Sequence, residues 1–128
     1  MGKTVDPARL ADIVRDYRFA YLITVDDEYR TRATTVMPTY DGAGFDVGPV
    51  GRHRRASLAQ HRDVTLVWPP HEVNQYSLIV DGEAELFDDP TASVRVTPKR
   101  ALLHRPVFTD DTESATSGIS DCVEITEA

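Results

Sequence analysis

The chain of 128 residues has a single cysteine, Cys122, so no disulfide can form within it. A reducing compartment such as the cytoplasm is the simplest location for such a chain. No apolar run approaches the length that spans a bilayer, and the first residues contain no apolar segment like that of a signal peptide. We therefore expect a cytoplasmic protein that does not use a membrane.

The chain also lacks an excess of positive charge. Lysine and arginine number 14 against 21 aspartates and glutamates, which gives a formal net charge of -7 at pH 7. A domain that binds nucleic acid usually has a basic balance, so nucleic acid is not the expected partner. Hydrophobic residues make up 41% and charged residues 27%, as in an ordinary soluble domain. The length predicts one domain over residues 1–128.

Hydrophobic periodicity and turn signals predict a helix followed by many short strands. Asp6 and Pro7 form a typical helix start, and apolar residues recur at helical spacing as far as Tyr17. The segment 109–120, rich in Thr, Ser and Asp, is predicted to be a loop. A second helix is predicted over 52–61, and strands over 19–25, 30–39, 45–47, 64–68, 76–87, 93–97, 101–104 and 122–126. Strands that do not alternate with helices indicate a mainly β (α+β) barrel with appended helices.

The strongest chemical signal is a basic segment in this acidic chain. Four arginines and two histidines lie between Arg52 and Arg62, where a Gly/Pro turn opens the second predicted helix. Free backbone N–H groups at a helix N-terminus, flanked by guanidinium groups, suit a phosphate. The helix dipole disfavours cations at this end. We therefore interpret the arginines as ligands of an anion rather than as a solvated surface.

The order of these pieces resembles the pyridoxamine-phosphate-oxidase-like flavin split barrels. The resemblance covers roughly residues 6–89, through the strand YLITV, an arginine-bearing strand, a DG turn, FDV, the basic helix start, VTLVW and YSLIVDGEAEL. It implies a six-stranded, Greek-key-like split barrel, with an N-terminal helix over one opening and a short helix between strands. It also implies a homodimer that binds FMN or the deazaflavin coenzyme F-420 between subunits. Some members of the superfamily bind haem or biliverdin instead.

The resemblance assigns residues to the phosphate and to the flavin ring. In the oxidase pattern the second strand carries an Arg and then a Lys for the phosphate; Arg32 stands at the first position, and the second falls near Met37 or Pro38. The helix-start pattern Ser-Arg-Lys matches residues 52–54, and the Gln that meets the ring falls near Ser77. The C-terminal Arg segment of true pyridoxamine-phosphate oxidases has no match, so oxidation of vitamin B6 is not expected.

Independently of this resemblance, the chemistry of these residues fits the binding of a flavin. Arg52 and Arg54 suit a ribityl phosphate, and glycines allow the backbone to approach closely. A flavin ring needs an apolar slot with a few polar contacts, and the cofactor itself does the redox work, so no catalytic residue is predicted. Arg32 is either a ligand or part of a surface ion pair, and His53 is either a ligand or an exposed polar residue. The predicted cofactor-binding residues are Arg32, Thr34, Thr35, Val47, Gly48, Arg52, His53, Arg54 and Ser77.

Two classes of function remain open. The first is an FMN- or F-420-dependent oxidoreductase that acts on a small or planar substrate. The second is a non-catalytic split barrel that binds flavin or haem as a sensor or stress protein; the missing Lys and the small Ser77 keep it open. FMN is the first choice of cofactor, F-420 the alternative and haem the weaker candidate. The spacing of His61, His71 and Cys122 matches no set of metal ligands, so no metal is predicted.

Overall fold

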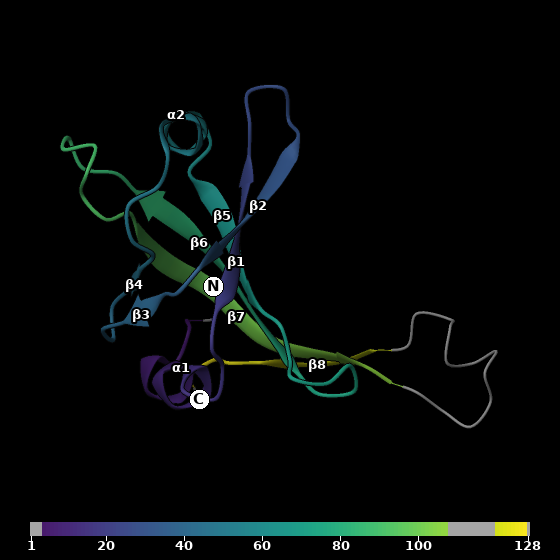
Figure 1. Cartoon of the computed structure of the whole chain (residues 1–128). Helices are drawn as coiled ribbons and strands as arrows, with labels where there is room; N and C mark the ends of the chain where they lie inside the picture. The colour runs from purple at the N-terminus through teal and green to yellow at the C-terminus, as the bar shows by residue number, and fades with distance from the viewer. Residues whose placement is uncertain (1–3, 108–119, 128) are drawn as a thin grey trace.

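The structure is a computed structural model that describes residues 4–107 and 120–127. Two helices and eight strands lie within these residues (Figure 1). The elements are α1 (Pro7–Val14), β1 (Ala20–Val25), β2 (Thr31–Val36), β3 (Thr39–Tyr40), β4 (Phe45–Asp46), α2 (Arg52–Gln60), β5 (Asp63–Trp68), β6 (Ser77–Glu85), β7 (Arg95–Pro106) and β8 (Ser120–Glu124). Neither helix has the length and the apolar run needed to cross a membrane.

The described strands form one antiparallel sheet. Their order is β2-β1-β5-β6-β7-β4-β3, and β8 pairs with β7 beyond the β4 contact. The sheet curls around a single core while its two end strands, β2 and β3, stay unpaired with each other, so the architecture is a half-barrel (Figure 1). The expectation of a mainly β barrel with two appended helices is thus confirmed.

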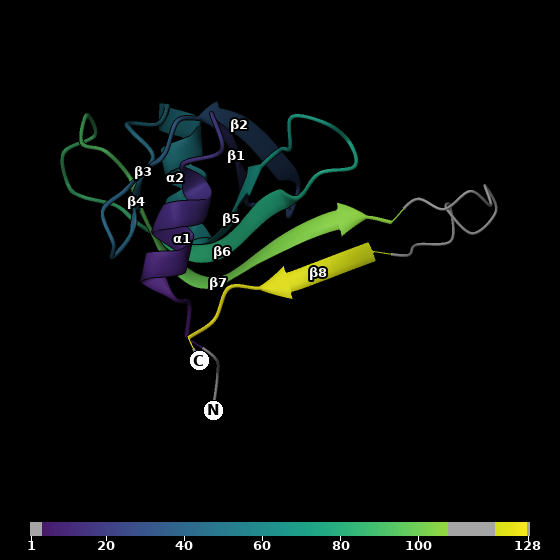
Figure 2. The same cartoon turned by 90° about the horizontal axis from the view of Figure 1, so that it is seen from below.

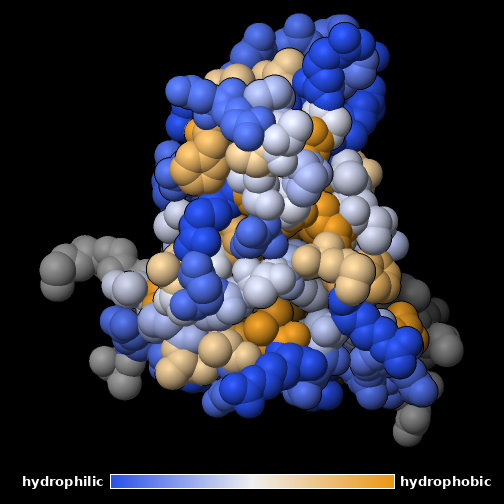
Figure 3. All heavy atoms as spheres, turned by 60° about the vertical axis from the view of Figure 1, so that its left-hand side comes forward, coloured by the Kyte–Doolittle hydropathy of each residue, from blue (hydrophilic) through white to orange (hydrophobic). Residues whose placement is uncertain are grey.

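The core lies on the concave side of the sheet. Residues of β1, β5 and β6 alternate between buried and partly exposed, as the two-residue period of a strand requires. Below the sheet, α1 is capped by the Asp6 carboxylate, which accepts hydrogen bonds from the N–H groups of Ala8 and Arg9. Leu10 of α1 is fully buried in the core, so the helix covers one opening of the barrel (Figure 2). On the face in Figure 3, apolar residues reach the surface only in separate patches between hydrophilic ones.

The strand count of six is wrong, since the structure has eight strands in its described residues. The predicted strand over 30–39 is divided between β2 and β3 by Met37 and Pro38, because proline has no N–H to donate to a ladder. The short β3 and β4 form a separate hairpin. The predicted loop over 109–120 lies outside the described residues, except for Ser120 at the start of β8.

The two strands predicted over 93–97 and 101–104 are one strand, β7, that passes through Pro98. A β-bulge explains how the strand tolerates this proline. Asp81 pairs with Arg100 but the next residue, Gly82, pairs with Pro98, so Lys99 is the extra residue. Bulges interrupt the hydrogen-bond ladder, and proline in a sheet is found mainly at bulges and edges.

The first and last described segments of the chain also pair with each other. Val5 forms a β-bridge with Thr126, and the N–H of Glu127 donates to the carbonyl of Thr4 at 3.0 Å. The N–H of Asp6 donates to the carbonyl of Ile125 at 3.3 Å. The segment that leads into α1 is therefore held by the segment that follows β8.

Candidate functional site

The N-terminus of α2 is the centre of the candidate site. Gly51 is its N-cap residue and offers no side chain to accept from the first-turn N–H groups, in contrast to Asp6 of α1. The first intrahelical bond runs from the N–H of Arg55 to the carbonyl of Gly51 at 2.9 Å. The N–H groups of the three residues between them, all cationic or polar, thus lack a side-chain acceptor in the described protein. Such donors suit an external anion.

The turn before α2 is held in place by hydrogen bonds of Gly48 to neighbouring residues. Gly48 has a φ of 82°, a conformation that residues with a Cβ rarely adopt. Its N–H donates to the Asp46 carboxylate at 2.8 Å, and its carbonyl accepts from the N–H of Val94 at 3.0 Å. At the other end of α2, the fully buried Leu58 anchors the helix in the core, and the Arg55 guanidinium donates to the carbonyl of Phe87. The start of α2 is therefore rigidly placed beside β2.

A pocket of about 510 Å³ opens between β2, this turn and the start of α2; we call it the Arg52 pocket. Its lining combines apolar side chains with threonine hydroxyls and cations, and it contains no carboxylate. The lining residues are Thr34, Thr35, Val36, Met37, Val47, Gly48, Pro49, Val50, Gly51, Arg52, His53 and Arg54. A pocket with an apolar wall and uncompensated positive charge at one end suits a planar ligand that carries an anion.

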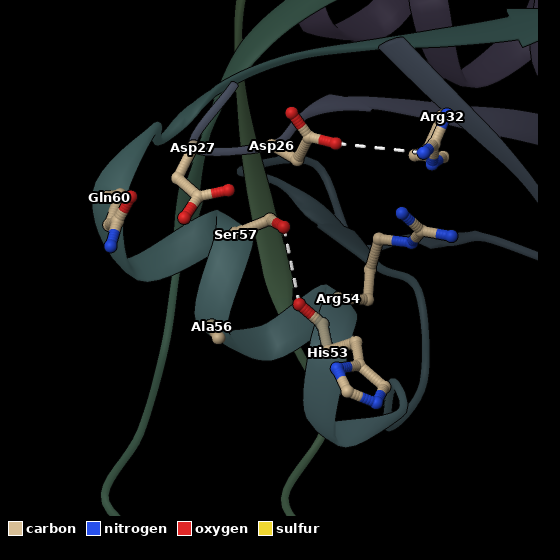
Figure 4. Close-up of a pocket in the computed structure, with 8 residues that line it drawn as sticks. All are labelled: Asp26, Asp27, Arg32, His53, Arg54, Ala56, Ser57 and Gln60. Atoms are coloured by element: carbon tan, nitrogen blue, oxygen red, sulfur yellow. Dashed lines mark hydrogen bonds and ion pairs between the residues drawn. The ribbon is translucent and has the colours of Figure 1, made fainter. Parts of the chain in front are cut away.

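A second pocket of about 350 Å³ lies between the β1–β2 turn and the other side of α2; we call it the Asp26 pocket (Figure 4). Asp27 points towards α2 across it, while the Asp26 carboxylate points towards Arg32, with 3.7 Å between Nη2 and Oδ2. Hydrogen bonds from the N–H groups of Arg30 and Glu28, helped by nearby guanidinium groups, lower the pKa of Asp26. Asp26 is therefore charged at neutral pH and offsets Arg32, which makes this pocket the poorer site for a phosphate.

Arg54 lies at the boundary of the two pockets and lines both of them. Its Nη1 donates to Oγ1 of Thr24 at 3.3 Å. Thr24 is fully buried on the inner face of β1, directly opposite Arg32 in the β1–β2 register. In Figure 4 the guanidinium group of Arg54 lies below Arg32, on the same side of the pocket. The β1–β2 hairpin thus positions both arginines.

The structure brings most of the predicted site residues together. Arg32 lines the Asp26 pocket, and Ser77 lines neither pocket. Ser77 begins β6, three strands away from β2, which corresponds to roughly 14 Å across the sheet. The other seven residues line the Arg52 pocket: Thr34, Thr35, Val47, Gly48, Arg52, His53 and Arg54.

Sequence reasoning missed three residues of this region. Asp26 and Asp27 lie between the strands predicted over 19–25 and 30–39, and a hairpin at this point brings its turn beside the arginine-bearing strand. Thr24 had been counted only as part of an apolar strand. A signal for it was present, because Thr24 is the polar member of the inward-facing series that begins with Ala20 and Leu22.

Solved structures share this fold at low sequence identity. A Clostridium acetobutylicum protein related to general stress protein 26, of the pyridoxinephosphate oxidase family, has a TM-score of 0.65 and 12% identity over 93% of this chain and 94% of its own. A heme binding protein from Mycobacterium smegmatis has a TM-score of 0.58 and 19% identity over 93% of this chain and 58% of its own. An F420 reductase has a TM-score of 0.54 and 11% identity over 69% of this chain and 90% of its own. The chain thus has the split β-barrel fold of these structures, and the fold that the resemblance implies is confirmed.

Closer relatives are found among mycobacterial proteins. The uncharacterized protein Mb0449c of Mycobacterium bovis and the uncharacterized protein MT0457 of Mycobacterium tuberculosis are each 46% identical to this chain over 135 aligned residues, which cover 95% of both partners. The chain belongs to the same family as these two proteins. No family model matches it.

Proposed function

We propose that the protein binds FMN or the deazaflavin F-420 in the Arg52 pocket and acts as an oxidoreductase on a small or planar substrate. The observation that carries this proposal is the uncapped N-terminus of α2, with Arg52 and Arg54 in its first turn, beside an apolar pocket that has no carboxylate. Relatives in fold that are named for a pyridoxinephosphate oxidase family and for F420 reduction support the choice of cofactor class.

The phosphate would lie at the start of α2. A ribityl phosphate is a dianion, and it suits forked guanidinium donors together with helix N–H groups. Arg52 is exposed, and within residues 4–107 and 120–127 it makes no ion pair that would compete with a ligand. Arg54 supplies the second guanidinium, and His53 stands between the two at the pocket edge. Arg32 contributes less, because Asp26 already faces it.

The ring would lie against β2 and the 47–51 turn. Val47 and Val50 offer apolar surface, while the hydroxyls of Thr34 and Thr35 offer polar contacts to a ring edge. Met37 stands near the position where the oxidase pattern has a lysine; its side chain is 77% exposed and adds apolar surface to the pocket rather than charge. When bound, the cofactor supplies hydride transfer. The residues of this chain bind it, orient it and leave one side open to a substrate.

A homodimer would complete this site. The outer face of the sheet carries the apolar side chains of Tyr21, Val67 and Ile79 in one row across β1, β5 and β6, with Ile23 in the next row. These residues are only partly buried in the single chain. Ser77 lies on the same outer face, so a second copy packed there would bring one protomer's Ser77 towards its partner's cofactor.

A non-catalytic role is the second candidate. The absence of the pattern's lysine, and the small Ser77 where the pattern has a glutamine, favour a protein that stores or senses a cofactor, flavin or haem. Fold relatives named for general stress and for heme binding support this reading. The visible spectrum of the purified protein separates the two cofactors, because oxidised flavin has characteristic absorption maxima and haem gives a Soret band.

The test of the proposal is a fluorescence titration with FMN, and a parallel one with F-420, on the wild type, Arg54→Ala and Arg52→Ala. Hydrogen bonds to charged groups contribute about 1.5–3 kcal/mol each, so each variant should bind roughly ten- to a hundredfold more weakly. The loss should shrink at high salt, which screens the wild-type contact.

Arg15→Ala is the control, because Arg15 is exposed and faces only Asp12 at 3.9 Å on α1. If both variants bind FMN and F-420 as tightly as Arg15→Ala, the start of α2 is not the phosphate site. Arg52→Ala is the cleaner of the two changes, since Arg54→Ala also removes the hydrogen-bond partner of Thr24.

A further inference from the structure

Thr24 is unusual among the inward-facing residues of the barrel. Within the described residues it is the single polar residue in the buried core, with no exposed surface. The neighbouring inward positions on β1 are Ala20 and Leu22, both fully buried as well. A valine has the same shape and would bury no hydroxyl, and a buried hydroxyl costs free energy unless it is hydrogen-bonded. The position therefore uses its hydroxyl for a contact.

The contact is with Arg54. Oγ1 of Thr24 accepts a hydrogen bond from Nη1 of Arg54 at 3.3 Å, and the Arg54 side chain is partly buried. A guanidinium group has five N–H donors in a fixed plane, so one bond to Thr24 fixes an edge and leaves the others free. Thr24 itself lines neither the Arg52 pocket nor the Asp26 pocket, so it acts only through Arg54.

The alternative partners of Arg54 explain why such a contact matters. Both pockets include Arg54, but the two carboxylates, Asp26 and Asp27, lie only in the Asp26 pocket. The neighbouring Arg32 is already drawn to Asp26. A guanidinium group not held by Thr24 would be attracted to the same carboxylates and would move away from the Arg52 pocket.

We infer that Thr24 is a positioning residue for the phosphate site: its buried hydroxyl holds the Arg54 guanidinium at the boundary of the two pockets, where its free N–H groups remain available to a phosphate. This inference rests on the proposed function and adds to it a residue that touches no ligand. If Thr24 served only for packing, valine would replace it without any effect on the phosphate.

The experiment compares FMN with riboflavin, which has the same ring and ribityl chain but no phosphate. Fluorescence titrations are made on the wild type, Thr24→Val and Thr24→Ser. Thr24→Val should weaken FMN binding by about two- to twelvefold, the equivalent of one hydrogen bond, and should leave riboflavin binding unchanged. Thr24→Ser keeps a hydroxyl at the position and should restore the preference for FMN, which also covers the case in which Thr24→Val folds poorly.

Thr65→Val is the matched control. Thr65 lies on the adjacent strand β5, and its hydroxyl donates to Asp81 at 2.8 Å on the outer face, so any effect of its change on the fold or the dimer would alter FMN and riboflavin binding alike. The same substitution there should not change the ratio of FMN to riboflavin affinity. A double-mutant cycle gives the coupling, because Thr24→Val should have no further effect on FMN binding once Arg54 is alanine.

Two outcomes overturn the inference in different ways. If Arg54→Ala loses its preference for FMN but Thr24→Val and Thr24→Ser both keep it, the proposed function stands and Thr24 is a packing residue. If Arg54→Ala and Arg52→Ala also keep the wild-type ratio, the phosphate site is elsewhere, and the inference about Thr24 fails together with the proposed function.

Discussion

Gly82 and Pro98 face each other at the bulge between β6 and β7, and the contact leaves no room for a side chain. A Cβ added to Gly82 would lie 2.5 Å from the carbonyl oxygen of Thr97 and 2.8 Å from Cγ1 of Val96. The carbonyl belongs to the backbone of a paired strand and cannot simply turn away. The close approach of β7 to β6 at this point therefore requires a glycine.

We predict that Gly82→Ala lowers the free energy of unfolding by about 1–3 kcal/mol, the usual cost of forcing extra volume into a packed site. Urea unfolding followed by circular dichroism measures it. Gly51→Ser is the control and should not lower the stability, because a Cβ there would meet nothing within 4 Å and serine is a favoured N-cap residue. Equal stability of Gly82→Ala and the wild type would show that the bulge can open without cost.

The residues around the site divide into those that a sequence can indicate and those that it cannot. The arginines before β5 stood out, because basic residues at a helix start in an acidic chain contradict the helix dipole. Thr24 did not stand out in the sequence. Its importance follows only from its burial and from the hydrogen bond that Arg54, which belongs to another element, donates to its hydroxyl. Likewise, the ion pair between Asp26 and Arg32 depends on the register of the β1–β2 hairpin, which neither residue type reveals.

Among the elements, the β3–β4 hairpin depends on one ion pair. Asp41, in the turn of the hairpin, receives two contacts from Arg95 at the start of β7: 3.0 Å from Nη2 to Oδ1 and 2.7 Å from Nη1 to Oδ2. Its Oδ1 also accepts from the N–H groups of Ala43 and Gly44 at 2.9 Å. The Arg95 hydrogen bond, followed by those from Ala43 and Gly44, holds the pKa of Asp41 well below its usual range.

This lowered pKa makes the contribution of Asp41 depend on pH in a defined direction. The carboxylate stabilises the fold above its unfolded pKa of about 3.9, and the stabilisation disappears as the pH falls through the lower folded pKa. We predict that Asp41→Asn melts at a lower temperature than the wild type above pH 4, and that the difference narrows as the pH falls below 4. Circular dichroism melts between pH 7 and pH 2 measure it.

The control for this series is Asp12→Asn, since Asp12 forms only an exposed contact of 3.9 Å with Arg15. Its melting temperature should follow that of the wild type throughout. A difference between Asp41→Asn and the wild type that stayed constant from pH 7 to pH 2 would mean that the charge of Asp41 does not stabilise the hairpin.

At the scale of elements, the apolar strands and both helices were predictable, because long periodic runs and the start signal of Asp6 and Pro7 are local features. The division of 30–39 and the fusion of 93–97 with 101–104 were not. Both outcomes involve a proline: Pro38 has no N–H to continue the ladder of β2, whereas β7 accommodates Pro98 because Gly82 on the opposite strand lets it approach.

For the whole molecule, the order of strands and helices was enough to predict a split barrel through its resemblance to a known family. The partner that covers the outer face of the sheet does not follow from the order of elements within one chain. We predict that the protein is a homodimer, in which a second copy covers the apolar row of Tyr21, Val67 and Ile79. Light scattering at micromolar concentration should give twice the mass of the chain.

Variants on this face locate the interface. Ile79→Asp and Tyr21→Glu should each yield a monomer with weaker FMN binding, because a charge on the row opposes its burial. Val73→Asp is the control, since Val73 is already 73% exposed in the connection between β5 and β6 and should leave the dimer intact. A wild-type protein that scatters as a monomer at micromolar concentration would contradict the prediction.

The pairing of the first described segment with the last bears on how the molecule is made. During synthesis, Thr4 and Val5 leave the ribosome long before Thr126 and Glu127, with which they pair. The segment before α1 therefore has no backbone partner until translation has passed β8. Contacts between residues so far apart in sequence form slowly, because the chain between them must first be ordered. In folding during synthesis, the barrel can thus close at this point only after β8 has been made.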